Sequence, residues 1–169
     1  MSWNFSAIYV NSEPPERLAA AQEAIGRPLP GDKRFVCYDF MEGEIPEDGQ
    51  LEELSQEYGE VVFLWINAHS ETLQYQHWGE GVRLRLVEKG DEGWGPLEGE
   101  PEPWEAFMFS RRNEIEEMMA SDPEQAPEWQ AIWDGGVLVE GSLCPFSGAE
   151  DVASLVAREL NLELFPGKG

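Results

Sequence analysis

The run Val61-Val62-Phe63-Leu64-Trp65-Ile66 decides the fold of this chain. All six side chains are apolar, and Gly59 and Asn67 bound the run on its two sides. A strand with one wet face alternates apolar and polar side chains, whereas a short continuous apolar run is typical of a strand buried on both faces. We therefore expect residues 61–66 to form a central strand that is covered on both sides.

The next two apolar-polar runs, residues 72–78 and 82–87, predict a β-hairpin around Gly79-Glu80-Gly81. A two-residue turn at Gly79-Glu80 would place glycine first, as a type II′ turn prefers. Register matters here, because a shift of one residue exchanges the two faces of a strand. The pairs expected from this turn are Trp78 with Gly81, His77 with Val82, Tyr75 with Leu84, and Leu73 with Leu86.

In that register Arg83 and Arg85 share the face that carries Gln74 and Gln76. A three-residue loop would instead place both arginines opposite Tyr75 and His77. The first arrangement predicts a small cationic patch that could grip a carboxylate or phosphate through paired N–H donors. The alternative is that both arginines pair with glutamates of the chain itself, with Glu105 as a candidate partner for Arg83.

The remaining patterns complete an α+β fold, in which a central antiparallel β-meander is flanked by N-terminal and C-terminal helices. Apolar spacing, caps, glycines and prolines set the expected boundaries. A single domain is expected over 1–169, with 166–169 as a frayed tail. Strands are predicted at 3–10, 33–40 and 94–97, with an edge strand at 137–139, and helices at 16–25, 51–58, 111–120, 127–134 and 148–160.

Composition limits the functions that this chain can have. It holds 34 acidic and 11 basic side chains, for a formal charge of -23. Such a charge opposes contact with nucleic acid or an anionic membrane, since both depend on neutralising phosphates. An apolar content of 41%, with seven Trp and eight Phe, predicts a packed core and not a disordered acidic tail. Adaptation to high salt is an alternative source of the charge, although it would favour aspartate and fewer aromatic residues.

Several sequence features predict a soluble, cytoplasmic protein. The N-terminus has no cationic start followed by an apolar run, so we expect no signal peptide. No apolar stretch approaches the ~20 residues that span a bilayer. The two cysteines, Cys37 and Cys144, lack a CxxC spacing and lie among apolar residues, which is typical of buried thiols in a reducing compartment.

No motif for catalysis or cofactor binding is present. The two histidines, His69 and His77, show neither an HxxxH nor an HxH spacing for zinc. The chain has no GxSxG nucleophile turn and no glycine-rich phosphate loop. The sequence therefore predicts no catalytic residue, no metal site and no cofactor.

Residues 81–105 combine an arginine-bearing hairpin strand, glycine turns and a Gly-x-Pro stretch that leads to an aromatic residue and Glu. In this respect the chain resembles uncharacterised small bacterial proteins of an immunity-protein-like kind. The resemblance implies a small cytoplasmic domain and supplies no catalytic residues. The residues that carry it are Gly81, Arg83, Leu84, Gly99, Pro101, Trp104 and Glu105.

Two functions of different classes remain. The first is an acidic binding module that covers a basic surface of a partner protein such as a toxin or nuclease, as immunity and inhibitor proteins do. Acidic loops at 41–53 and 98–105 would supply the charge, and exposed tryptophans would supply anchors. The expected binding residues are Trp78, Arg83, Arg85, Trp94, Glu98, Glu100, Glu102, Trp104 and Glu105.

The second is a small enzyme or ligand-binding domain with an aromatic pocket. Trp65, Tyr75, His77 and Trp104 would line that pocket. A structural subunit of a homo-oligomer is a further alternative, which the charge of -23 opposes unless the contact face is apolar. The sequence leaves the oligomeric state open.

Overall fold

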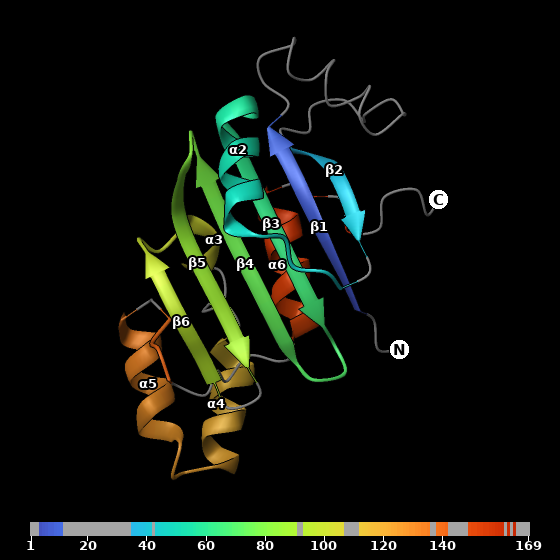
Figure 1. Cartoon of the computed structure of the whole chain (residues 1–169). Helices are drawn as coiled ribbons and strands as arrows, with labels where there is room; N and C mark the ends of the chain where they lie inside the picture. The colour runs from blue at the N-terminus through green and yellow to red at the C-terminus, as the bar shows by residue number, and fades with distance from the viewer. Residues whose placement is uncertain are drawn as a thin grey trace.

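A computed structural model describes residues 4–11, 35–41, 43–90, 93–106, 112–135, 138–141, 149–160, 162 and 164. These residues form an antiparallel sheet with strand order β2-β1-β3-β4-β5-β6 (Figure 1). The predicted α+β class is confirmed. The strands are β1 (Asn4–Asn11), β2 (Phe35–Met41), β3 (Glu60–Asn67), β4 (Thr72–Gly79), β5 (Val82–Gly90) and β6 (Gly93–Gly99); the helices are α2 (Asp48–Tyr58), α3 (Pro103–Ala106), α4 (Arg112–Ser121), α5 (Ala126–Gly135) and α6 (Ala149–Leu160).

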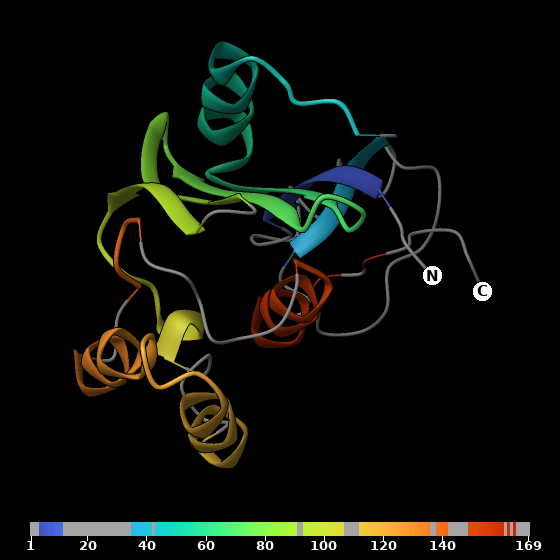
Figure 2. The same ribbon diagram turned by 90° about the horizontal axis from the view of Figure 1, so that it is seen from below.

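Helices cover both faces of the sheet (Figure 2). Helix α2 lies on one face, and α3 and α6 lie on the other. Strand β3 supplies apolar side chains to both layers: Phe63 packs in the cluster with α2, and Leu64 packs in the cluster with α6. Both are fully buried. The prediction of a central strand covered on both sides is confirmed.

Helix α2 is amphipathic, and its inner face fastens the β4–β5 hairpin. Leu51, Leu54 and Tyr58 recur at helical spacing and are buried against the sheet. The buried hydroxyl of Ser55 accepts a hydrogen bond from the backbone N–H of Gly81 at 2.8 Å. Compared with the predicted helix at 51–58, α2 begins three residues earlier, at Asp48, and ends at the expected residue, Tyr58.

The predicted register of the β4–β5 hairpin is wrong. The turn residues are Glu80 and Gly81, with φ of 49° and 83°, and Gly79 pairs with Val82. Positive φ at both turn residues is the geometry of a type I′ turn, which matches the twist of the flanking strands. The backbone N–H of Glu80 donates to the carbonyl of Gly59 at 2.9 Å. The C-terminal end of α2 thus holds both turn residues, which local turn preference does not reveal.

A β-bulge in the same hairpin separates the two arginines. The pairing shifts between Trp78, which lies opposite Arg83, and His77, which lies opposite Arg85. A bulge adds one residue to one strand and re-aims the side chains that follow it. Arg83 consequently faces α2, while Arg85 faces α3, so the two arginines do not share a strand face as predicted.

Most other predicted elements are present, with shifts of a residue or two at their ends. Among the described residues of the predicted strand 137–139, Leu138 and Val139 have no regular structure; the nearby contact with β6 is one hydrogen bond from Gly141 N–H to the carbonyl of Trp94 at 2.5 Å. Cys37 is buried in β2, as expected. The predicted helix at 16–25, Cys144 and the tail at 166–169 lie outside the described residues.

In the described part of the chain, no helix combines the length and apolar character needed to cross a membrane.

The close approach of β6 to β5 at Gly99 gives a first test of this fold. Gly99 has a φ of +85°, and an added Cβ would lie 2.0 Å from the carbonyl oxygen of Leu84. We expect Gly99→Ala to lower the free energy of unfolding by about 3 kcal/mol, since backbone atoms must move. Gly49→Ala is the control: no atom lies within 4 Å of its added Cβ. Urea unfolding should show this control unchanged or slightly stabilised, and equal effects of the two substitutions would contradict the packing described here.

Candidate functional site

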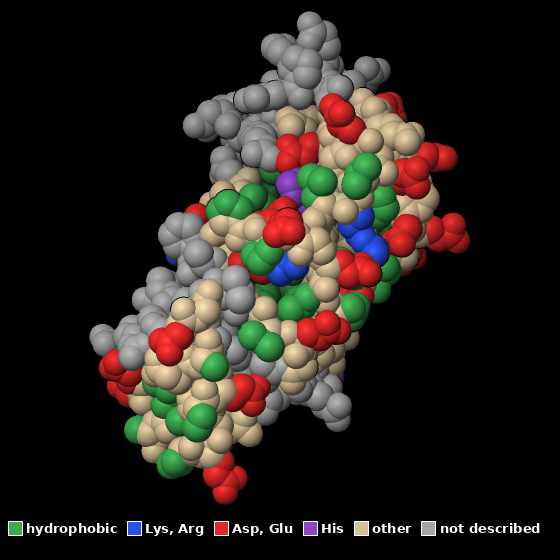
Figure 3. Space-filling model, turned by 90° about the vertical axis from the view of Figure 1, so that its left-hand side faces the viewer, with side chains coloured by type: hydrophobic (Ala, Val, Ile, Leu, Met, Phe, Trp, Pro, Cys, Tyr) green, Lys and Arg blue, Asp and Glu red, His purple; other side chains and the backbone are tan. Residues whose placement is uncertain are grey.

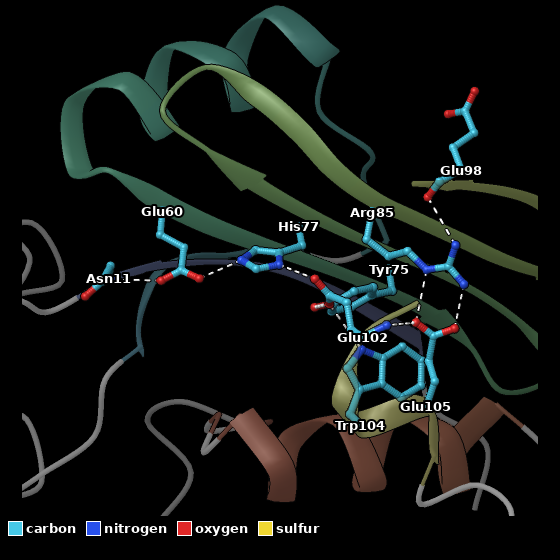
Figure 4. A network of polar contacts seen from close by, with 9 residues as sticks. All are labelled: Asn11, Glu60, Tyr75, His77, Arg85, Glu98, Glu102, Trp104 and Glu105. Carbon is cyan, nitrogen blue, oxygen red and sulfur yellow. Dashed lines mark hydrogen bonds and ion pairs between the residues drawn. The ribbon is translucent and has the colours of Figure 1, made fainter. Parts of the chain in front are cut away.

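A network of polar side chains lies between the sheet and α3 (Figure 4). Tyr75 and His77 belong to β4 and, two residues apart, face the same side of the sheet. Arg85 faces that side from β5. The groups that bond to these side chains come from β3, from the segment that leads into α3, and from α3 itself. The whole network comprises Asn11, Glu60, Tyr75, His77, Arg85, Glu98, Glu102, Trp104 and Glu105.

His77 lies at the centre of the network, with a carboxylate on each ring nitrogen. Its Nε2 lies 2.6 Å from Glu60 Oε2, and its Nδ1 contacts Glu102 Oε2. Asn11 Nδ2 donates to the other oxygen of Glu60 at 2.8 Å. Burial opposes protonation of the imidazole, but the hydrogen bonds to Glu102 and Glu60 outweigh it and raise the pKa of His77 to about 9. His77 is therefore an imidazolium at neutral pH.

Glu102 is the acceptor on which three side chains converge. Tyr75 OH donates to Oε1, and Trp104 Nε1 donates to the same oxygen at 3.3 Å. Burial raises the pKa of the Glu102 carboxyl, but the hydrogen bond from His77 and the weaker contributions from its other donors leave that pKa below its usual value. The Glu102 carboxylate is consequently held in its ionised form beneath the sheet.

Arg85 and Glu105 form a buried ion pair beside Glu102. Arg85 Nε and Nη2 donate to the two oxygens of Glu105 at 3.0 and 2.5 Å. The side chains of Arg85 and Glu105 are only 4% and 1% exposed. Arg85 Nη1 also donates to the carbonyls of Glu98 and Gly99, and the Glu102 N–H donates to Glu105 Oε2 at 2.6 Å. This pair therefore fixes the path of the chain from the end of β6 into α3.

The contacts around His77 hold the segment before α3 in place, and they are poorly suited to proton transfer. To act as a general base or as a metal ligand, a histidine needs a ring nitrogen with a free lone pair. Both nitrogens of His77 carry protons and donate them to Glu60 and Glu102. Among the described residues, no three His, Cys, Asp or Glu side chains gather in a way that could hold a metal ion.

Three of the four residues expected to line an aromatic pocket do come together. Tyr75, His77 and Trp104 meet at Glu102. Trp65 belongs to the opposite layer, with Nε1 donating to the carbonyl of Gly43 at 3.1 Å. The predicted grouping is wrong for Trp65 because alternate residues of β3 face opposite sides of the sheet.

The expected tryptophan anchors are not on the surface. Trp78 is 6% exposed, and Trp94 and Trp104 are each 2% exposed. Trp78 faces α2, and the Cζ atom of Arg83 lies over its ring, 5.9 Å from the ring centroid. Trp94 and Trp104 pack in the core below the sheet. The prediction that exposed tryptophans anchor a partner is therefore wrong.

The acidic segment at 98–105 divides into two parts. Glu98 and Glu100 are exposed, as a binding role requires. Glu102 and Glu105 turn inward to His77 and Arg85. Burying a carboxylate needs a positive partner, and these two cations supply it. Glu102 and Glu105 therefore stabilise the fold and are not part of an acidic surface.

The alternative in which the arginines pair with the chain's own glutamates is confirmed. Arg83 bonds Glu98 and lies 3.4 Å from Asp48, whereas Glu105 is the partner of Arg85 and not of Arg83. The other two cations with described side chains are Lys89, which donates to the carbonyl of Glu71, and Arg158, which pairs with Glu159. Each cation described in full thus donates to an acceptor within the chain.

Carboxylates, in contrast, are left on the outside of α2 (Figure 3). The helix buries one face and presents its acidic side chains to solvent on the other. We call these side chains and the acidic residues just before the helix the α2 acidic face. Its exposed members are Glu44, Glu47, Asp48, Glu52, Glu53 and Glu57.

Comparison with known proteins gives no relative: no family model, no curated protein and no solved structure matches this chain.

Sequence reasoning missed the role of Glu60 and the inward turn of Glu102. The available signal was Tyr75 and His77, two polar aromatic side chains on the buried face of an otherwise apolar region. Buried polar groups need hydrogen-bond partners. That rule predicts hydrogen-bond acceptors close to Tyr75 and His77. The sequence has 34 acidic residues, however, and does not show which of them lie there.

The raised pKa of His77 predicts a pH dependence of stability. A folded-state pKa of about 9 against a model value of 6.5 means that the imidazolium stabilises the fold fully below about pH 6.5. This contribution is lost as pH rises through 9, and it amounts to about 3 kcal/mol. We expect the stability difference between the native chain and His77→Gln, from urea unfolding, to shrink by that amount between pH 6 and pH 9.5. A difference that stays constant over this range would contradict the assigned protonation.

The two arginine pairs offer a matched comparison of buried and exposed charge. Glu105→Gln should destabilise the protein by about 3 kcal/mol, because Arg85 keeps a buried charge without its partner. Glu98→Gln makes the same chemical change at a side chain that is 54% exposed, and should cost less than about 1 kcal/mol. Urea unfolding measures both, and equal costs would show that Glu105 is not in a buried pair.

Proposed function

We propose that this protein is an acidic binding module that covers a basic surface on a partner protein, as an immunity or inhibitor protein does, in the cytoplasm. The observation that carries the proposal is the division of charge. Each cation with a described side chain is bonded within the chain, while the carboxylates of the α2 acidic face point outward. Opposite potentials accelerate the encounter of two proteins and disfavour partners of like charge.

The placement of the α2 acidic face on a helix supports this proposal. Leu51, Leu54 and Tyr58 fix α2 against the sheet, so its outer carboxylates need not be ordered when a partner binds. Preorganised groups lose less conformational entropy on association than groups on a mobile loop. Asp48 and Glu98, both bonded to Arg83, extend the acidic surface from α2 toward β6.

The alternative of a small enzyme or ligand-binding domain has less support. The side chains that would do the chemistry, Tyr75, His77 and Trp104, already satisfy one another through Glu102. A substrate would have to displace at least one of these buried hydrogen bonds, each of which costs free energy to break. A binding surface on α2 requires no such rearrangement.

Capture of a partner at low ionic strength tests the proposal. Native chain, an α2 variant with Glu52→Gln, Glu53→Gln and Glu57→Gln, and a control with Glu117→Gln, Asp122→Asn and Glu124→Gln at the end of α4 would each be used as bait. Both variants lose three exposed carboxylates, so they carry equal charge. A basic protein retained by the native bait would then be purified and its Kd measured.

We expect the α2 variant to bind this partner about tenfold more weakly, since each exposed pair contributes about 0.5 kcal/mol. The control should bind like the native chain, and affinity should fall steeply with salt. A salt-insensitive complex, equal weakening by both variants, or the absence of any basic partner would each refute the proposal.

A further inference from the structure

Two neighbouring apolar side chains are exposed at the tip of the β4–β5 hairpin. Val82 is 60% exposed and Leu84 is 44% exposed. Pairing between β5 and β6 ends where Arg85 meets Gly99, so the first residues of β5 extend past their neighbour strand. No strand pairs with that end of β5 on its outer side within the described residues. We call Val82 and Leu84 the hairpin-tip pair.

The two side chains lie on the same side of the hairpin. Val82 pairs with Gly79, which has no side chain to cover it. Leu84 lies over the same glycine, because an added Cβ at Gly79 would be 3.0 Å from Leu84 Cδ1. Val82 and Leu84 are alternate residues of β5, and alternate residues of a strand point to the same side. The result is a small continuous apolar surface and not two separate residues.

Carboxylates lie on the α2 side of the hairpin tip and in its turn. Arg83 lies between Val82 and Leu84, and its guanidinium bonds Asp48 and Glu98. Glu80 in the turn is exposed directly before Gly81. Arg83, the cation between the two residues of the hairpin-tip pair, is thus neutralised by two carboxylates, and Glu80 in the turn adds a third carboxylate close in sequence.

We propose that the hairpin-tip pair is the apolar centre of the binding surface, and that it receives an apolar side chain from a partner whose surrounding residues are Lys and Arg. This inference rests on the proposed function and specifies the partner's contact chemistry. Protein interfaces commonly combine an apolar centre, which supplies most of the binding energy, with a polar rim. Here Val82 and Leu84 form the centre, and Glu80, Asp48 and Glu98 form the rim.

Charge argues for a basic partner and against a second copy of this chain. Two copies that met at the hairpin tip would bring Glu80, Asp48 and Glu98 of one chain toward the same residues of the other. With a net charge of -23 on each chain, that contact would be strongly repulsive. Lysine or arginine at these positions of a partner would form ion pairs instead.

Two synthetic peptides test this inference on the full chain. One has lysines on both sides of a central Leu-Trp-Leu, and the other has serines in those three central positions. Their charge is equal, so they differ only in the apolar centre. Titration by fluorescence anisotropy at low salt should show that the native chain binds the first peptide about tenfold more tightly than the second, because only the first can bury apolar surface.

A hairpin variant, Val82→Ser with Leu84→Ser, should reduce this preference to about twofold or less. The control variant, Met118→Ser with Val139→Ser, removes two other exposed apolar side chains, one in α4 and one beyond α5, and should keep the preference. Urea unfolding would check that both variants retain native stability, as expected for exposed positions.

The outcomes separate this inference from the proposal on which it rests. If the native chain binds both peptides equally, or if the hairpin variant keeps the preference, the inference fails while an acidic binding surface remains supported. If neither peptide binds at low salt, both fail. Concentration-dependent self-association that the hairpin variant abolishes, measured by light scattering, would also overturn the inference, because the occupant would then be a second copy.

Discussion

The buried pair of Arg85 and Glu105 is the interaction on which the lower layer of this protein depends. Glu105 binds both Arg85 and the backbone N–H of Glu102, so a single carboxylate joins β5 to the start of α3. Glu102 is thereby placed to accept from Tyr75 and His77. Breaking a buried ion pair leaves an uncompensated charge in a medium of low dielectric constant, and this penalty maintains the arrangement. The path of the chain from β6 into the C-terminal helices follows from it.

Cations are scarce in this chain, so the buried network matters for the charge balance of the folded protein. A chain with a formal charge of -23 repels itself in the compact state, and few positive groups are available to offset that repulsion. Two of them, Arg85 and the imidazolium of His77, lie beneath the sheet, where they allow three carboxylates to be buried or half-buried. Arg83 instead bridges Asp48 and Glu98 at the surface. Among the described residues, buried charge is therefore nearly balanced, and the unpaired carboxylates lie at the surface.

The β4–β5 hairpin connects the two layers and shows how one local feature controls both. Its bulge sends Arg83 to the α2 side and Arg85 to the α3 side. The tip before the bulge leaves Val82 and Leu84 exposed on one side, with Leu84 over Gly79. With a regular hairpin, the two arginines would share a face, and one of the two layers would lose its cation. The bulge thus gives each of the two layers one arginine.

The sequence by itself determined the elements of this protein: a strand at 61–66 buried on both faces, an amphipathic helix that ends at Tyr58, the antiparallel α+β class and a negative surface. These follow from local periodicity and from composition, which the order of residues states directly. Only the tertiary structure decided the hairpin register, the burial of Trp78 and the partners of the arginines. The reason is physical. The turn is held by Ser55 of α2 and by Gly59, which directly follows that helix. The sequence offers each arginine many glutamates as possible partners, whereas the fold places only a few of them close enough to bond. Local preference for glycine in the first turn position is weaker than the two hydrogen bonds that the backbone N–H groups of the turn donate, one to the Ser55 hydroxyl and one to the Gly59 carbonyl.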